Sequence, residues 1–185
     1  MKNSPIIIDS DGWLNHIKHH PSPNFDDRPS DTSIDLLVIH NISLPPEQFG
    51  DNYILDFFTN QLDATAHPYF KEIADMTVSA HVLIRRDGEI IQLVSFNKRA
   101  WHAGQSNFNG QERCNDFSIG IELEGSDTQI FTEDQYHSLI TITQILLNNY
   151  SELTPDRITG HSDISPGRKT DPGDFFDWKR YKNQL

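Results

Sequence analysis

A continuous apolar run at residues 35–40 places the strongest constraint on what this chain can fold into. The sequence there, Asp-Leu-Leu-Val-Ile-His, is typical of a β-strand that is buried on both faces. A second strand is predicted at 117–124, where apolar residues alternate with small or acidic ones. Its apolar face belongs to a core. On its other face, Gly120 leaves open space beside Glu122, as the floor of a cleft would.

Helices are predicted between these two strands and after the second. Four segments have the capping residues or the apolar spacing of helices: 52–59 with Asp51 as its cap, 67–74, a long helix at 132–149 that begins with a capping box, and a C-terminal stretch at 175–181. A hairpin is expected at 78–94 because Asp87-Gly88 joins two apolar segments. Residues 97–116 are expected to form a long connection, and 158–173 a loop too rich in turn residues for a helix. This interleaving favours an α/β (α+β) fold, with a mixed β-sheet flanked by helices.

The length of 185 residues favours a single domain, spanning residues 1–185. Residues 1–33 are polar and proline-rich, and they can form either an ordered strap over that domain or a loose arm. The sequence does not decide between these two arrangements.

Charge and cysteine content exclude several classes of function. The chain carries 15 Lys and Arg against 27 Asp and Glu, a net charge of −12 with histidines neutral. This balance argues against binding to nucleic acid, to an anionic membrane or to a polyanionic cell wall. Cys114 is the only cysteine, so neither a disulfide framework nor a thiolate zinc site is expected. With only Ile6 to Ile8 as an apolar run near the start and no run long enough to span a membrane, we expect a cytoplasmic protein without an obligate partner.

Two of the nine histidines stand out because each lies where an apolar strand gives way to a loop. These are His40 and His161, and Asp171 follows ten positions after the second. Two imidazoles and one carboxylate hold Zn²⁺ with a fourth position open in hydrolytic sites. The spacing alone is weak support, because many proteins contain such residues near loops.

Two further residues have side chains suited to hydrolysis at such a site. Glu122 lies on the polar face of its strand, where a carboxylate could serve as a general base, although it could equally belong to a solvated acidic face. Lys169 is two positions before Asp171, so in an extended segment both side chains point the same way. Its ammonium could stabilise an oxyanion, or it could be a surface lysine paired with an aspartate.

Several segments, in the same order along the chain, resemble one known family. They are 40–46, 78–81, 100–104, 115–125, and 160–161 together with 168–173. Over about residues 13–178 the chain resembles the zinc-dependent N-acetylmuramoyl-L-alanine amidases of the second amidase family. Its closest resemblance is to members that act on 1,6-anhydro-muropeptides in cytoplasmic peptidoglycan recycling.

The resemblance implies a fold, a cofactor and a reaction. The fold would be the mixed sheet shared with peptidoglycan recognition proteins, and the reaction the cleavage of the amide between the lactyl group of N-acetylmuramic acid and L-alanine. It implies these roles: His40, His161 and Asp171 as ligands of one Zn²⁺ per chain, Glu122 as catalytic acid/base, Lys169 as stabiliser of the transition state, and Asn41, Trp101 and Arg113 on segments that line the muropeptide cleft. Members often carry an arginine where this chain has Thr77.

Three other functions fit the sequence less well. A module that binds peptidoglycan without cutting it is disfavoured, because non-catalytic relatives commonly lose a zinc ligand and every position is filled here. A lytic amidase acting on intact wall would need access to the wall and, usually, a more cationic surface. A purely structural zinc site is disfavoured by a three-ligand set without thiolates.

Overall fold

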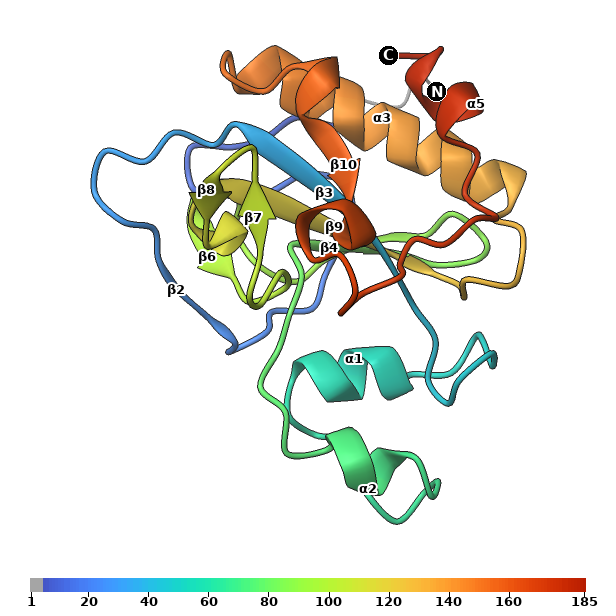
Figure 1. Ribbon diagram of the computed structural model, residues 1–185. Helices are drawn as coiled ribbons and strands as arrows, with labels where there is room; N and C mark the ends of the chain where they lie inside the picture. The colour runs from blue at the N-terminus through green and yellow to red at the C-terminus, as the bar shows by residue number, and fades with distance from the viewer. Residues whose placement is uncertain (1–4) are drawn as a thin grey trace.

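A six-stranded mixed β-sheet forms the centre of the molecule in the computed structural model, which describes residues 5–185 (Figure 1). Its strands in spatial order are β1 (Lys18–His19), β5 (Ile90–Gln92), β4 (Val82–Ile84), β9 (Ser118–Glu124), β3 (Leu36–Ile42) and β10 (Ile158–Gly160). Only β4 and β5 pair antiparallel, as the Asp87-Gly88 signal predicted, and the other neighbours are parallel. The carboxyl ends of β4, β9, β3 and β10 therefore meet along one edge.

The remaining elements surround this sheet. The helices are α1 (Tyr53–Phe58), α2 (Phe70–Ile73), α3 (Glu133–Asn149), α4 (His161–Ile164) and α5 (Trp178–Lys182), with 3₁₀ turns at Cys114–Asp116 and Pro155–Arg157. Two small antiparallel pairs are formed by β2 (Phe25–Asp27) with β6 (Lys98–Ala100), and by β7 (Asn107–Phe108) with β8 (Gln111–Glu112). No helix within residues 5–185 has the length and hydropathy needed to cross a membrane.

The two faces of the sheet are covered differently. Alternate residues of β3 and β9, such as Ile39 and Ile121, pack against Leu139, Ile142 and Leu146 of α3. As Figure 1 shows, α3 and α5 lie together on this side. Helix α3 begins at the predicted capping box, since the Thr132 side chain accepts from the Gln135 backbone N–H and the Gln135 side chain accepts from that of Thr132.

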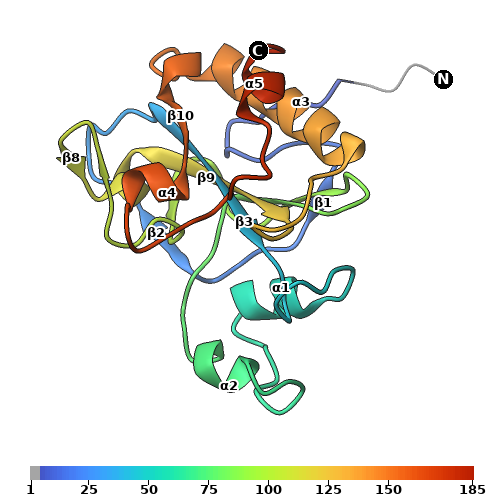
Figure 2. The same ribbon diagram turned by 45° about the vertical axis from the view of Figure 1, so that its right-hand side comes forward.

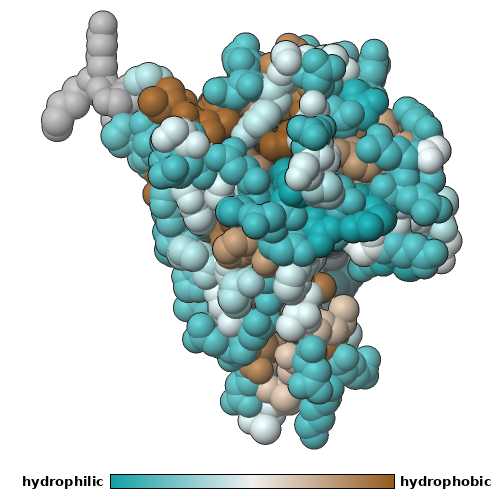
Figure 3. All heavy atoms as spheres, turned by 90° about the vertical axis from the view of Figure 1, so that its left-hand side faces the viewer, coloured by the Kyte–Doolittle hydropathy of each residue, from teal (hydrophilic) through white to brown (hydrophobic). Residues whose placement is uncertain are grey.

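The opposite face carries the long 97–116 connection, α4, and a lobe built from α1 and α2. This lobe has its own apolar core, which joins Phe57, Phe58 and Phe70 to Leu83 and Ile91 of the sheet. Figure 3 shows apolar side chains on this lower lobe, while polar side chains cover most of the face above it.

The N-terminal segment is an ordered strap from residue 5 onward, and residues 1–4 of the predicted strap lie outside the described residues. Its strands β1 and β2 pair with β5 and β6, and Leu14 is fully buried. Arg28 is half-buried and donates to the carbonyl oxygens of Phe96, Asn115, Asp116 and Ser118. Because these carbonyls belong to separate parts of the domain, Arg28 ties the strap to the sheet.

Four local expectations were wrong. The first short helix has Asn52 rather than Asp51 at its N-cap position, without a side-chain cap, and the second is a single turn. The 158–173 segment does contain a helical turn, α4, because the Asp163 carboxylate accepts from the Gly160 backbone N–H and caps it. The space above Gly120 is not open, because the ring of His102 lies there, and a Cβ on Gly120 would come within 2.5 Å of it.

Candidate metal centre

Strand register brings the candidate residues together at the carboxyl edge of the sheet. In the parallel pair β3–β9, His40 lies opposite Glu122, and in β10–β3, Gly160 lies opposite Ile39. His161 therefore leaves β10 beside His40, and the α4 turn starts at that point (Figure 2). Asp171 returns to the same place because the Ser162 backbone N–H donates to its carbonyl oxygen at 2.9 Å.

The side chains of His40, His161 and Asp171 converge on one point. His40 Nδ1 lies 3.0 Å from His161 Nδ1 and 3.0 Å from Asp171 Oδ2, and His161 Nδ1 lies 3.1 Å from the same oxygen. Both histidines are almost completely buried. Burial lowers the pKa of His40 to about 4, so its ring is neutral near pH 7, as a metal ligand must be.

The chemistry of this donor set fits a metal ion. Nε2 of His161 faces the Ala103 carbonyl oxygen at 3.1 Å, and a carbonyl can only accept, so that nitrogen carries the proton. Nδ1 of a neutral His161 then has a lone pair directed at the Asp171 carboxylate, which is an unfavourable contact unless a cation lies between them. The three residues could hold such an ion, since all their ligand atoms lie within 4.8 Å of one another.

Glu122 places an unpaired carboxylate oxygen next to this group. Its Oε2 is buried and has no hydrogen-bond partner among the described residues. Burial raises the pKa of Glu122 well above its usual value, the nearby Asp171 raises it further, and Lys169 opposes both. An orphaned buried carboxylate is costly to keep, and its position facing a cavity is typical of a group that exchanges protons with a ligand.

A cavity of about 350 Å³ opens beside the candidate metal centre. Glu122, His161, Lys169 and Asp171 line one side of it. The other side is apolar and comes mainly from the lobe of α1 and α2: Leu44, Phe57, Phe58, Tyr69, Ile73, Met76 and Val78. The position of Thr77 lies between two of these lining residues.

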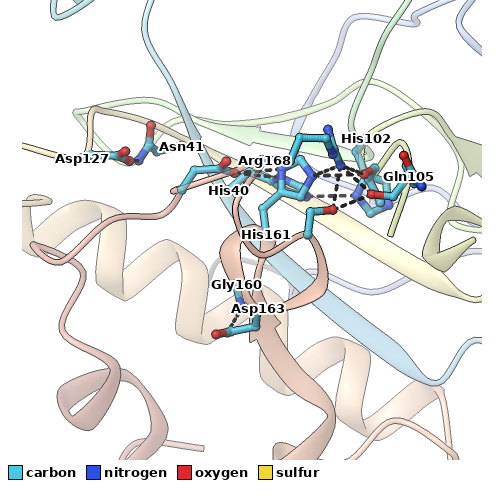
Figure 4. Close-up of polar contacts among 12 residues, drawn as sticks. His40, Asn41, His102, Gln105, Asp127, Gly160, His161, Asp163 and Arg168 are labelled. Carbon is cyan, nitrogen blue, oxygen red and sulfur yellow. Dashed lines mark hydrogen bonds and ion pairs between the residues drawn. The ribbon is translucent and has the colours of Figure 1, made fainter. Parts of the chain in front are cut away.

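The three predicted substrate-binding residues lie in two places. Asn41 and Trp101 line the cavity beside the metal centre. The amide of Asn41 donates to Asp127 at 2.7 Å (Figure 4), and the Trp101 indole donates to Asp26 at 3.1 Å, so both side chains are held. Arg113 instead lines a neighbouring cavity of about 380 Å³, where it also forms an ion pair with Asp116 at 3.2 Å.

His102 is the site residue that the sequence reasoning missed. It lies in the 97–116 connection, and its Nδ1 is 2.9 Å from Nε2 of His40 (Figure 4). Two features of the sequence could have indicated His102. It is a histidine in a long connection, and the predicted strand at 117–124 contains a single glycine, Gly120. Gly120 leaves room for another group at close range, and that group is the His102 ring.

Comparisons with known proteins agree with this geometry. The profile of the N-acetylmuramoyl-L-alanine amidase family matches residues 30–174. The 1,6-anhydro-N-acetylmuramyl-L-alanine amidase AmpD of Haemophilus influenzae is 59% identical over 174 residues, covering 94% of this chain and 95% of that protein. AmpD of Escherichia coli K12 is 56% identical over 171 residues, covering 92% and 93%.

Solved structures show the same similarity. The crystal structure of a selenomethionine AmpD derivative superposes with a TM-score of 0.94 at 53% identity, covering 97% of this chain and 99% of that one. AmpDh3 from Pseudomonas aeruginosa, in complex with an anhydromuramic pentapeptide, gives a TM-score of 0.60 at 28% identity and covers 84% of this chain and 62% of that one.

Proposed function

This chain belongs to the N-acetylmuramoyl-L-alanine amidase family. From that premise we propose that it hydrolyses the amide between the lactyl group of 1,6-anhydro-N-acetylmuramic acid and L-alanine, in peptidoglycan recycling. The proposal is supported by relatives named for this activity, which match nearly the full length of the chain. The observation that carries it is the convergence of His40, His161 and Asp171 beside the orphaned carboxylate of Glu122.

We infer that the metal is one Zn²⁺ per chain, held by His40, His161 and Asp171. Two imidazoles and a carboxylate without thiolates are the ligand set of catalytic zinc, which keeps a position open. When bound, zinc would lower the pKa of a water molecule toward neutrality and polarise the scissile carbonyl.

Glu122 moves the proton in this mechanism. Its carboxylate takes a proton from the attacking water and later delivers it to the departing amine of L-alanine. Two features support this role: Oε2 has no competing partner, and a raised pKa lets the side chain retain a proton between the two steps.

Lys169 supplies positive charge to the same cavity. Its ammonium lines the wall together with Glu122, and its charge acts on that carboxylate. A cation at this position favours the negative charge that develops on the carbonyl oxygen as the water attacks.

The substrate is a small soluble muropeptide, and we place the reaction in the cytoplasm. The cavity volume of about 350 Å³ is within the range of small-molecule sites. Asn41 and Trp101 would orient the substrate there, and Arg113 would contact it from the neighbouring cavity. The net charge of −12 supports a substrate detached from the anionic wall, and it disfavours nucleic-acid or membrane partners.

The test compares three substrates with the zinc-loaded protein: an anhydro-muramyl tripeptide, the same peptide on the reducing sugar, and purified sacculi. We expect release of free peptide from the first, loss of activity with a chelator, and recovery on adding zinc. An unhydrolysed complex would show a binding module instead. Digestion of sacculi as fast as the free anhydro-muropeptide would show a lytic amidase.

A further inference from the structure

Two consecutive residues, His102 and Ala103, contact both candidate histidine ligands on the side away from Asp171. Nε2 of His40 lies 2.9 Å from Nδ1 of His102 (Figure 4). Nε2 of His161 lies 3.1 Å from the carbonyl oxygen of Ala103. The Nδ1 atoms of both ligands point the other way, toward Asp171.

Proton positions follow from these contacts. Ala103 offers only an acceptor, so Nε2 of His161 carries a hydrogen and Nδ1 is left with its lone pair. If His40 also binds through Nδ1, its Nε2 carries the hydrogen and donates to Nδ1 of His102. His102 then carries its own hydrogen on Nε2, which lies 3.1 Å from the Ser118 hydroxyl. In this assignment each of these three contacts pairs a donor with an acceptor, because the Ser118 hydroxyl can accept.

The segment that makes these contacts is itself fixed. The side-chain oxygen of Asn115 accepts from the backbone N–H groups of His102 at 3.1 Å and Ala103 at 2.8 Å. Arg168 donates to the Ala103 carbonyl oxygen at 2.7 Å. On the sheet side, only a glycine at position 120 leaves room for the His102 ring. A residue that orients a metal ligand must itself be held in place, and these contacts hold His102 and Ala103 from several sides.

We propose that His102 and Ala103 hold both histidine ligands in the Nε2–H tautomer, so that each presents Nδ1 to the metal. His102 is thus a positioning residue for the metal centre. This inference rests on the zinc site proposed above. The competing explanation is that His102 only fills space between the long connection and β9.

Two substitutions distinguish a role of His102 as a hydrogen-bond acceptor from a role in filling space. His102→Phe keeps a ring of similar size but removes the acceptor, whereas His102→Asn is smaller and keeps an acceptor near the Nδ1 position. We expect His102→Phe to weaken zinc binding about 10–100-fold, as loss of such outer contacts does, and His102→Asn to bind more tightly than His102→Phe. Zinc affinity is measured by competition with a chelating dye, with far-UV circular dichroism to establish that each variant is folded. A folded His102→Phe variant that binds zinc as well as the wild type, or a His102→Asn variant that binds no better than His102→Phe, would overturn the proposal.

A direct reading of the tautomers needs no activity measurement. In the zinc-loaded wild-type protein labelled with ¹⁵N-histidine, long-range ¹H–¹⁵N spectra at pH 7.5 distinguish protonated from unprotonated ring nitrogens. We expect His40 and His161 to carry the proton on Nε2, and His102→Phe to mix the tautomers of His40 while leaving His161 unchanged, because Ala103 remains. A proton on Nδ1 of either wild-type ligand would contradict the proposal. Failure of the wild-type protein to bind zinc would instead refute the proposed function, independently of the tautomers.

Discussion

At the scale of single residues, Glu122 carries the clearest catalytic prediction. Its carboxylate has an unpaired buried oxygen beside the three candidate metal ligands, whereas the neighbouring Glu124 on the same strand accepts from Arg85 and Arg86 and is fully engaged. The sequence alone could not separate these two glutamates, because both occupy the same face of β9. The difference arises from distant residues that reach only one of them.

Glu122→Gln is therefore expected to lower kcat by about 10²–10⁴, since the amide cannot accept the proton of the attacking water. Zinc content should stay near one per chain, measured by metal analysis of the purified variant. Exposed Glu152 offers a matched control, Glu152→Gln, with activity expected to be unchanged. Loss of zinc from Glu122→Gln would make this residue a ligand or a structural group.

Lys169 is expected to act on the transition state rather than on binding. Its ammonium lines the cavity beside Glu122, where charge develops on the substrate carbonyl during attack. Lys169→Ala should lower kcat by about 10²–10³ with little change in KM, whereas the control Lys179→Ala, at an exposed position on α5, should change neither. Steady-state kinetics at saturating zinc give both constants. A raised KM with an unchanged kcat would assign Lys169 to ground-state anchoring.

At the scale of elements, the junction between β10 and α4 sets the position of His161. Gly160 occupies it, and an added Cβ would lie 2.8 Å from Cδ of Pro172, the residue that follows the Asp171 ligand. A proline ring cannot rotate away, so the backbone carrying Asp171 must move. Packing at this one position therefore links two of the three candidate metal ligands.

Gly160→Ala should for this reason weaken zinc binding as well as stability, the latter by about 1–3 kcal/mol, which is typical of overpacking. Thr132→Ala gives a matched comparison, because it removes the capping box of α3 at a cost of about 1 kcal/mol without touching the metal centre. Urea unfolding and zinc competition on both variants provide the measurement. Equal zinc affinity in the two would show that the junction tolerates the extra methyl group.

Elements with strong local signals could be predicted, and those that depend on distant partners could not. Strands β3 and β9 and the capped helix α3 follow from apolar periodicity and from Thr132 with Gln135. The turn α4 does not, because it is also held by a distant segment: the hydroxyl of Ser165, at its C-cap, donates to the Gln105 carbonyl oxygen. The role of Gly120 was misjudged for the same kind of reason, since the group that fills its space comes from a loop 18 positions earlier in the chain.

At the scale of the whole molecule, the candidate site is assembled by register. The parallel pairing of β9, β3 and β10 places Glu122, His40 and His161 at one edge, although they are separated by up to 121 positions. Their residue types were predictable, yet their proximity was inferred only through a family resemblance. The strap is a second case, because no local pattern indicates that Arg28 reaches four distant carbonyl groups.

Burying several histidines together makes the metal-free protein sensitive to acid. Burial, followed by the charge of Arg28, lowers the pKa of His81 to about 3, and burial likewise lowers that of His40 to about 4 and that of His102 well below its usual value. The unfolded chain then binds more protons than the folded one below about pH 6.5. The stabilisation from each neutral histidine is complete above that pH. It is lost as the pH falls toward the pKa of that histidine in the folded protein. Glu122 acts in the opposite sense, because its raised pKa lets the folded protein take up a proton at a higher pH than the unfolded chain does.

The contribution of His81 can be isolated because its ring contacts no candidate metal ligand by a hydrogen bond. Between pH 6.5 and 4.5, this residue should reduce the free energy of unfolding by about 1.4 kcal/mol per pH unit. His81→Gln should flatten the measured pH dependence by that amount, while His137→Gln, at an exposed position on α3, serves as the control. Urea unfolding with chelator present, repeated at several pH values, gives the slopes. An unchanged slope in His81→Gln would mean that His81 takes up its proton in the folded protein as easily as in the unfolded chain, and that burial and the charge of Arg28 do not keep it neutral.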